Sequence, residues 1–193
     1  MQRIGLFGGS FDPVHNAHLA LAESALLALQ LDQLRFIPAG QPWQKTRAMT
    51  PAVHRVAMLQ LAIAHEPRFV LDRIEIDRAG PSYTLDTVQA LRAQHPTTQW
   101  VLLIGQDQHA ALHTWHDWQT LITLVELAVA NRPGVVPTPH AGLPGVAHRR
   151  VPLPLLDISS TDLRARVARG ADISQHVPPD VARYIESHRL YRS

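Results

Sequence analysis

Apolar and polar positions along this chain predict short strands and longer helices in alternation. Apolar runs of strand length lie at residues 3–7, 34–38, 69–76, 99–104, 124–130 and 149–153. Stretches that are rich in Ala and Leu, or that carry capping signals, predict helices at residues 17–31, 52–65, 82–94, 112–121, 160–169 and 179–188. Strands that alternate with helices indicate βαβ units, so we expect an α/β fold built on a parallel sheet.

Nothing in this pattern divides the chain into separate parts. We expect one domain over residues 1–193, a Rossmann-like parallel sheet with helices on both faces, in which residues 159–193 form a small helical C-terminal section. Segments punctuated by Pro and Gly predict loops at residues 40–51 and 133–145. Hydrophobic residues make up 46% of the chain, which is enough to bury a sizeable core.

Composition excludes some kinds of chemistry. The chain has no cysteine, so a disulfide framework, a thiolate metal site and a cysteine nucleophile are all excluded. The N-terminus lacks a signal-like apolar stretch, and no run of about 18 apolar residues follows, so we expect a cytoplasmic protein without a membrane partner. The net charge is only +2 and basic residues are scattered, which does not favour a nucleic-acid partner. Lys45 is the only lysine among the 18 basic residues.

The first candidate site follows the first strand. Gly8 and Gly9 end that strand, where ligands bind in sheets of this kind, and glycine lets the backbone approach a ligand closely. His15 and His18 stand three residues apart at the entrance of the next helix, so both imidazoles can donate to one phosphate there. The alternatives are a capping or surface role and a zinc pair, which needs a third ligand. Asp12, before Pro13, is interpreted as a turn former.

A second phosphate signal lies near the C-terminus, in LDISSTDLRARVARG at residues 156–170. Ser159 or Ser160 is a natural N-cap, and Asp162 follows as in a capping box. Arg164 lies one turn into the helix. Hydroxyls, free N–H groups and an arginine at a helix N-terminus make a triphosphate clamp, whereas the alternative is an ordinary cap with a surface arginine.

Together these stretches resemble a known family along almost the whole chain. The matching motifs, in the family's order and spacing, are GGSFDPVHNAH (8–18), IPAGQPWQK (37–45), GPSYTLDTV (80–88), IGQD (104–107), TWHDW (114–118), NRPG (131–134), ISSTDLR (158–164) and YIESHRLYR (184–192). The first and seventh resemble the nucleotidylyltransferases with HxGH and ISSTxxR motifs. The PSYT, TW and RPG motifs resemble one branch of them, the bacterial nicotinate-nucleotide adenylyltransferases. The sequence differs from the family at Ala17, where glycine is usual, and at Gln44, where many relatives have histidine.

The resemblance implies transfer of AMP from ATP to nicotinate mononucleotide, giving deamido-NAD and pyrophosphate, with Mg²⁺ and no named protein ligand to the metal. His15, His18 and Arg164 would be the catalytic residues that hold the ATP phosphates. The further ATP-binding residues implied are Gly8, Gly9, Ser10, Phe11, Gly105, Asp107, Ile158, Ser159, Ser160 and Thr161. Those implied for the mononucleotide are Lys45, Thr84, Trp115, His116 and Arg132.

The chemistry of the implied reaction fits these residues. The attacking phosphate has a second pKa of about 6, so it is already an anion near neutrality and needs neither a general base nor a covalent enzyme intermediate. Catalysis then rests on positioning and charge stabilisation. For some residues a structural alternative stays open: a helix cap for Thr84, a loop or cap role for Asp107, and core packing for Trp115. Core packing is the expectation for Trp118.

Other functions stay open from the sequence. The same chemistry on nicotinamide mononucleotide or phosphopantetheine is one alternative, although the phosphopantetheine enzymes usually lack the first histidine and the PSYT and TW motifs. A non-catalytic nucleotide sensor on the same fold is another. A homo-oligomer is also left open.

Overall fold

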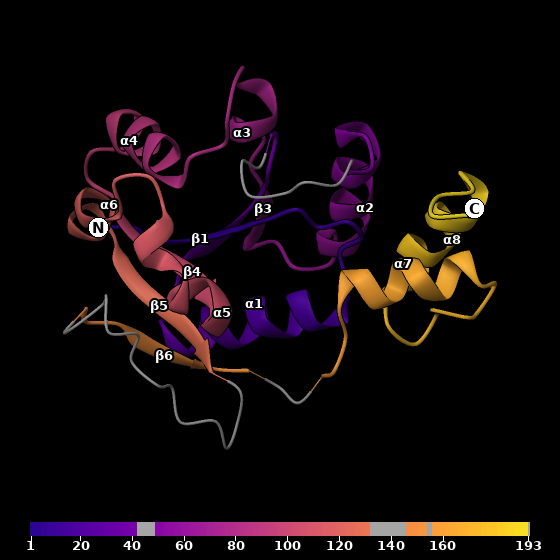
Figure 1. Ribbon diagram of the computed structural model, residues 1–193. Coiled ribbons are helices and arrows are strands. Elements are labelled where there is room, and N and C mark those ends of the chain that lie inside the picture. The colour runs from indigo at the N-terminus through magenta and orange to yellow at the C-terminus, as the bar shows by residue number, and fades with distance from the viewer. Residues whose placement is uncertain (42–48, 132–145, 154–155, 193) are drawn as a thin grey trace.

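The fold is seen in a computed structural model that describes residues 1–41, 49–131, 146–153 and 156–192. A six-stranded parallel sheet runs through it in the order β3-β2-β1-β4-β5-β6 (Figure 1). The strands are β1 (Arg3–Gly9), β2 (Gln33–Pro38), β3 (Phe69–Leu71), β4 (Gln99–Gly105), β5 (Glu126–Asn131) and β6 (Arg149–Pro152). The expected α/β fold with a parallel sheet is therefore confirmed. Gln44, Lys45, Arg132 and the loop expected at 133–145 lie outside the described residues.

The strand order reverses between β1 and β4, which lie side by side at the centre. From β1 the chain continues outward through β2 and β3, and after β4 it continues in the other direction through β5 and β6. Leu6 pairs with Arg35 of β2 on one side and with Leu102 of β4 on the other. In open parallel sheets such a reversal leaves a crevice at the carboxyl ends of the strands, and this is where ligands bind.

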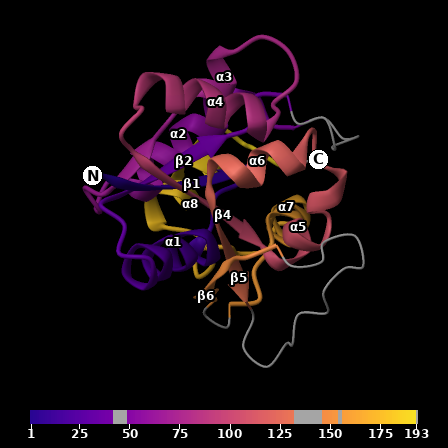
Figure 2. The same cartoon turned by 90° about the vertical axis from the view of Figure 1, so that its left-hand side faces the viewer.

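Helices cover both faces of the sheet (Figure 2). They are α1 (Asn16–Ala28), α2 (Ala52–Ile63), α3 (Ile74–Asp77), α4 (Thr84–Gln94), α5 (Gln106–Ala110), η1 (Leu112–Thr114), α6 (Trp118–Leu124), α7 (Ser160–Ala168) and α8 (Pro179–Ser187). Successive side chains of β4 point to opposite faces of the sheet, so this strand contributes to two hydrophobic cores. Val101 and Leu103 belong to the core under α1 and α2. Trp100 and Leu102 belong to the core under α4 and α6. Strands buried on both faces explain the nearly continuous apolar runs in the sequence.

Two expected elements are wrong in part. The strand predicted at 69–76 stops at Leu71, because the Asp72 carboxylate accepts a hydrogen bond from the Ile74 N–H at 3.1 Å and turns the chain into α3. The helix predicted at 112–121 is replaced by η1 and α6, with the unpredicted α5 before them. Trp115 is extended and Asp117 has φ 42°, so the helical path is interrupted between η1 and α6.

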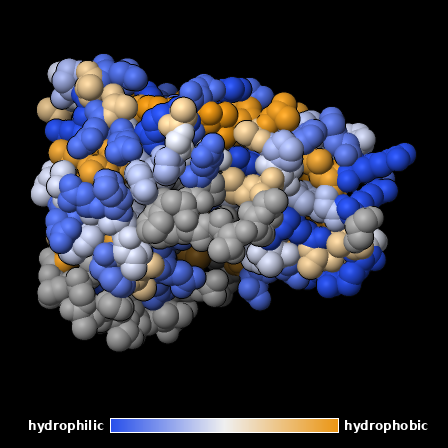
Figure 3. Space-filling model, turned by 45° about the horizontal axis from the view of Figure 1, so that its top comes forward, coloured by the Kyte–Doolittle hydropathy of each residue, from blue (hydrophilic) through white to orange (hydrophobic). Residues whose placement is uncertain are grey.

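The C-terminal helices α7 and α8 lie together at one end of the molecule, beside α2 (Figure 1). Leu163, Ile173, Val177, Val181 and Ile185 join the same hydrophobic cluster as α1 and α2. In the view of Figure 3, hydrophobic residues are interspersed with hydrophilic ones. Within the described ranges, no helix is long and apolar enough to cross a membrane.

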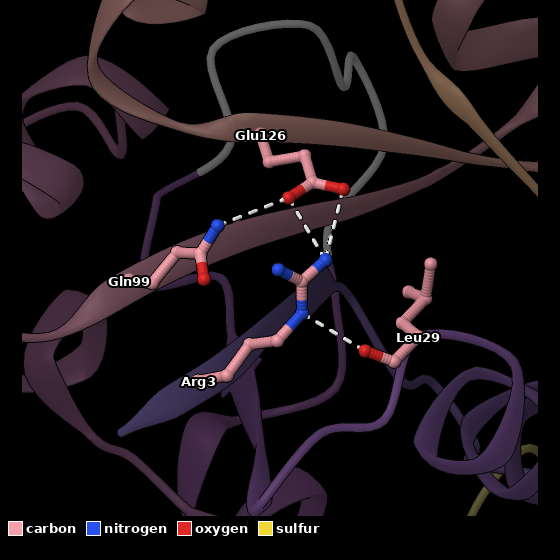
Figure 4. A network of polar contacts seen from close by, with 4 residues as sticks. All are labelled: Arg3, Leu29, Gln99 and Glu126. Carbon is pink, nitrogen blue, oxygen red and sulfur yellow. Dashed lines mark hydrogen bonds and ion pairs between the residues drawn. The ribbon is translucent and has the colours of Figure 1, made fainter. Parts of the chain in front are cut away.

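A polar network ties the amino-terminal edge of the sheet together (Figure 4). Arg3 on β1 donates through Nη2 to both carboxylate oxygens of Glu126 on β5, at 2.9 and 2.8 Å. Its Nε donates to the Leu29 carbonyl oxygen at 2.9 Å, and Gln99 on β4 donates to Glu126 at 3.3 Å. These contacts hold three adjacent strands in register at the edge opposite the crevice.

Candidate active site

A cavity of about 340 Å³ opens at the carboxyl ends of β1 and β4, where the strand order reverses. These strands contribute residues 6–9 and 102–105, and the remaining walls come from the end of β2, from α3 and the start of α4, and from the segments that follow β1 and β4. The predicted site residues that line the cavity are Gly8, Gly9, Ser10, His18, Thr84, Gly105, Trp115 and His116. Residues from four distant motifs of the sequence therefore meet at one place, as the topology requires.

His18 reaches the cavity from the first turn of α1, and its ring is tightly fixed. The rings of His15 and His18 stack with their centroids 3.6 Å apart, and the Phe11 ring meets His18 edge-on at 5.1 Å. The backbone N–H of His15 donates to His18 Nδ1 at 3.2 Å. Because Nδ1 is the acceptor, the proton of the neutral ring sits on Nε2, which makes that atom the ring's donor.

His15 is the buried member of this histidine pair. It is 5% exposed, and burial lowers the pKa of its imidazole from 6.5 to about 4. His15 is therefore neutral near neutral pH, so what it can offer a ligand is a hydrogen bond and not a charge. Its Nδ1 is buried without a hydrogen-bond partner, so the site contains a polar atom that the protein itself does not satisfy.

The glycines at the strand ends leave space for a ligand. A methyl group added at Gly8 or at Gly105 would meet no protein atom within 4 Å, and both residues line the cavity. A side chain there would enter the space of a bound molecule instead of the protein interior. At Gly9 an added methyl group would approach the Phe11 ring to 3.1 Å, so this glycine lets Phe11 pack beneath the turn.

Aromatic and polar residues line the opposite wall, at the start of α4 and after η1. The rings of Tyr83 and His116 lie 4.6 Å apart, and Trp115 joins them at the cavity. Thr84 is the first residue of α4, and the N-cap position is Tyr83 without a side-chain cap, so Thr84 is not the N-cap. Tyr83 was missed in the sequence, although it lies within the PSYT motif, because an aromatic residue before a helix gives no binding signal on its own.

Glu75 and Ser82 support this wall. Ser82 Oγ accepts the backbone N–H groups of Gly40 and Gln41, both at 3.1 Å. Burial raises the pKa of the Glu75 carboxyl, and Thr87 Oγ1 donates to Glu75 Oε1 at 2.9 Å. These contacts join the loop after β2 to the segment that leads into α4, so the cavity wall is one connected unit.

The start of α7 meets the turn after β1. Ser159 is the N-cap, and its side chain accepts the Asp162 N–H at 3.1 Å. Ser160 Oγ donates to the Pro13 carbonyl oxygen at 2.9 Å, and Arg164 Nη1 donates to the Asp12 carbonyl oxygen at 2.7 Å. The two phosphate motifs, 150 residues apart in the chain, are thus in direct contact. Thr161 accepts a bond from Arg164, and Ile158 packs against the core.

A buried arginine that the sequence reasoning missed holds the turn from below. Arg55 on α2 is 1% exposed and donates to the carbonyl oxygens of Thr50, Ser10 and Ala39 at 2.9, 2.9 and 2.8 Å. The negative charge that balances the Arg55 guanidinium is the carboxylate of Asp12, which is fully buried. An arginine inside a helix has no distinctive sequence pattern, and its role follows only from loops that the fold brings together.

Eight of the predicted ATP-binding residues are not among those that line the cavity: Phe11, His15, Asp107, Ile158, Ser159, Ser160, Thr161 and Arg164. Phe11 is 1% exposed, and its ring packs in the core against Phe7, Phe36 and His18. Asp107 is exposed in the first turn of α5 and is not among the residues that line the cavity. Trp118 packs partly buried against the second core cluster, as expected.

Comparison with known proteins identifies the class of this protein as the nucleotidyltransferases. The family model described as cytidylyltransferase-like matches residues 6–166 of the chain. A protein of Methylibium petroleiphilum named a probable nicotinate-nucleotide adenylyltransferase is 50% identical over 98% of this chain and 92% of its own length. One of Albidiferax ferrireducens with the same name is 46% identical over the full length of both chains.

The solved structures agree in fold. The nicotinic acid mononucleotide adenylyltransferase of Plasmodium falciparum, complexed with NaAD, superposes with a TM-score of 0.82 at 20% identity, covering 99% of this chain and 98% of that one. The chain thus belongs to the cytidylyltransferase-like family and, within it, to the nicotinate-nucleotide adenylyltransferases. The resemblance drawn from the motifs is confirmed.

Proposed function

We propose that this protein transfers AMP from ATP to nicotinate mononucleotide and releases deamido-NAD and pyrophosphate. The observation that carries the proposal is the cavity at the carboxyl ends of β1 and β4, which has His18 and the glycine turn on one side and the rings of Tyr83 and Trp115 on the other. The relatives at 50% and 46% identity bear the name of this activity, and the fold relative from P. falciparum is complexed with NaAD.

On the phosphate side, each residue has a distinct role in the proposal. His18 donates through Nε2 to an α-phosphate oxygen, and neutral His15 supports it from beneath. Arg164 supplies the positive charge at the start of α7, where helix N–H groups also favour anions. Gly8 and Gly105 leave the room that the nucleotide needs. Lys45 and Arg132, expected from the resemblance as phosphate ligands, lie outside the described residues.

On the acceptor side, Trp115 and Tyr83 offer ring faces for the pyridine. The first N–H groups of a helix have no partner within the helix, and α4 begins at Thr84, so this end of the cavity attracts the nicotinate carboxylate. His116, 4.6 Å from the Tyr83 ring, closes the same wall.

The transfer proceeds by direct attack. The phosphate of the mononucleotide attacks the α-phosphorus of ATP, a new phosphoanhydride bond forms, and the bond to the β-phosphate breaks with loss of pyrophosphate. The nucleophile is already an anion, so no protein group has to remove a proton. The work of the protein is to hold two like-charged reactants together and to stabilise charge on the α-phosphoryl oxygens.

A divalent metal ion is general in this family, and we propose Mg²⁺. Among the residues that the structure describes, no group of three or more His, Asp or Glu side chains could hold a metal ion. In nucleotide enzymes Mg²⁺ is usually bound through the phosphates of the substrate and only one or two carboxylates. We propose that the ion arrives here on the ATP phosphates and is not held by a cage of side chains. When bound, the ion neutralises phosphate charge beside His18 and Arg164.

We also propose that residues 1–193 act as one domain and that the protein works in the cytoplasm. In support of one domain, the C-terminal section completes the site through the bonds of Ser160 and Arg164 to the turn after β1. A cysteine-free chain has no need of an oxidising compartment.

A matched pair of tryptophan variants tests the acceptor assignment. Trp115→Leu should raise KM for nicotinate mononucleotide about tenfold, because one aromatic stacking partner of the pyridine ring is lost. KM for ATP should stay within about twofold of the wild-type value. Trp118→Leu is the control, because Trp118 packs against the same core cluster but does not line the cavity. Equal effects of both variants on the acceptor, or an effect of Trp115→Leu on ATP alone, would reject the assignment.

A further inference from the structure

The C-terminal tail reaches the phosphate-binding turn through one hydroxyl group. Tyr191, in the tail that follows α8, donates through its OH to Asp12 Oδ1 at 2.8 Å. The other carboxylate oxygen, Oδ2, accepts the backbone N–H of Thr50 at 3.3 Å. Asp12 itself is fully buried. A buried carboxylate requires partners for both oxygens, and one of the two comes from the tail.

Asp12 connects this hydroxyl to the residues that face the phosphates. It lies in the turn between Gly9 and His15, and its carbonyl oxygen accepts the bond from Arg164 Nη1 at 2.7 Å. Asp12 therefore links two residues. Its side chain accepts the hydrogen bond from Tyr191, and its backbone carbonyl accepts the one from Arg164, the cation predicted to bind phosphate. Arg55, which holds the neighbouring carbonyl of Ser10 at 2.9 Å, balances the charge of Asp12 from the other side.

The position of Tyr191 is well defined by its surroundings. Its ring packs against the hydrophobic cluster that includes Leu163 and Ile185, and the preceding Leu190 N–H donates to the Ile185 carbonyl oxygen at 3.0 Å. Its backbone has φ 63°, a left-handed conformation that a tyrosine adopts only where the surrounding structure imposes it. Burial and the Asp12 charge raise the pKa of the phenol, so the hydroxyl keeps its proton and donates a hydrogen bond to Asp12.

We propose that Tyr191 is a positioning residue for adenylyl transfer, which acts through Asp12 on Arg164. The proposal rests on the proposed function. It means that the tail is needed for the rate of transfer and not only for folding. A tyrosine that merely filled a core site would serve equally well as phenylalanine.

The test is Tyr191→Phe, which keeps the ring and removes only the hydroxyl. We expect kcat for pyrophosphate release from ATP and nicotinate mononucleotide to fall roughly tenfold, with a smaller change in both KM values. A tenfold fall is what the loss of one hydrogen bond to a charged group would produce. The matched control is Tyr184→Phe, which removes the bond between Tyr184 OH and His54 Nδ1 (2.9 Å) in the same C-terminal section. Its kcat should stay within about twofold of the wild type.

A double-mutant cycle shows whether the effect passes through Arg164. In an Arg164→Ala background, Tyr191→Phe should lower kcat by less than about twofold, because the group that it orients is gone. A full tenfold fall in that background, an unchanged kcat in Tyr191→Phe, or an equal fall in Tyr184→Phe would each overturn the proposal. If Tyr191→Phe does not fold, Asp12→Asn replaces it, with the same expected fall and the same criterion. A wild-type protein without turnover would instead reject the proposed function.

Discussion

The imidazole rings of His15 and His18 stack face to face with centroids 3.6 Å apart and planes inclined by 23°. Two protonated rings would repel each other at this distance, and burial resolves the conflict by lowering the pKa of His15 to about 4. One histidine is therefore a neutral support, and the other lines the cavity. The pair is asymmetric, although the sequence presents its members as equivalent.

This asymmetry predicts a large effect of His18→Ala on turnover. Loss of one donor to the developing charge on the α-phosphoryl oxygens should lower kcat by roughly 10² to 10³. The control is His65→Ala, because His65 is exposed at the end of α2. Steady-state pyrophosphate release measures both variants. A fall of less than about threefold in a folded His18→Ala protein would remove His18 from the mechanism.

The buried His15 should make the protein less stable in mild acid. Between pH 6.5 and about 4, the unfolded chain binds a proton at this histidine and the folded chain does not. The free energy of unfolding should thus fall as the pH drops through this window, by up to roughly 3 kcal/mol from this group. In His15→Asn the fall should be smaller. Urea unfolding at pH 7, 6 and 5 measures it, with His65→Asn as the exposed control, and equal slopes in His15→Asn and the wild type would contradict the account.

Two glycines should respond to alanine in opposite ways. At Gly8 the added methyl group meets no protein atom within 4 Å, so stability should be kept while KM for ATP rises about threefold to tenfold. At Gly40 it would collide with the Glu75 carbonyl oxygen, so the fold should lose about 1–3 kcal/mol. Thermal unfolding and ATP titration separate the two. Destabilisation by Gly8→Ala without a change in KM would show that Gly8 has a structural role instead.

The Arg3 network should affect stability without affecting catalysis. Arg3→Met removes its bonds to Glu126 and Leu29 at the edge of the sheet opposite the cavity (Figure 4). The side chains of the pair are only 21% and 26% exposed, so the loss should be about 1–3 kcal/mol. Urea unfolding gives the stability, and kcat measured well below the melting temperature should match the wild type. A kcat reduced several-fold in the folded variant would mean that this edge is coupled to the site.

The sequence predicted those parts of the site that are built locally. The glycine turn and the two histidines form one continuous segment, and Ser159 caps the helix that carries Arg164 as the pattern indicates. Such features depend on neighbours a few residues away, so they can be recognised without the fold. The order of strands and helices followed from periodicity for the same reason.

Contacts between distant segments escaped the sequence reasoning. Asp12 was interpreted as a turn former, yet its partners are Thr50, Arg164 and Tyr191, at separations of up to 179 residues. The helix expected at 112–121 is interrupted where Trp115 is extended and Asp117 is left-handed, and Trp115 lines the cavity at this point. Both cases show tertiary contacts outweighing the local pattern.

The most direct test of the account compares acceptors with the wild-type protein. Each reaction contains ATP, Mg²⁺ and one acceptor, which is nicotinate mononucleotide, nicotinamide mononucleotide or phosphopantetheine. Pyrophosphate release and the mass of the product are measured for each acceptor. We expect strong release with nicotinate mononucleotide and formation of deamido-NAD in equal amount, with much weaker release from the other two. Preference for another acceptor, or ATP binding without release from any of them, would contradict this expectation.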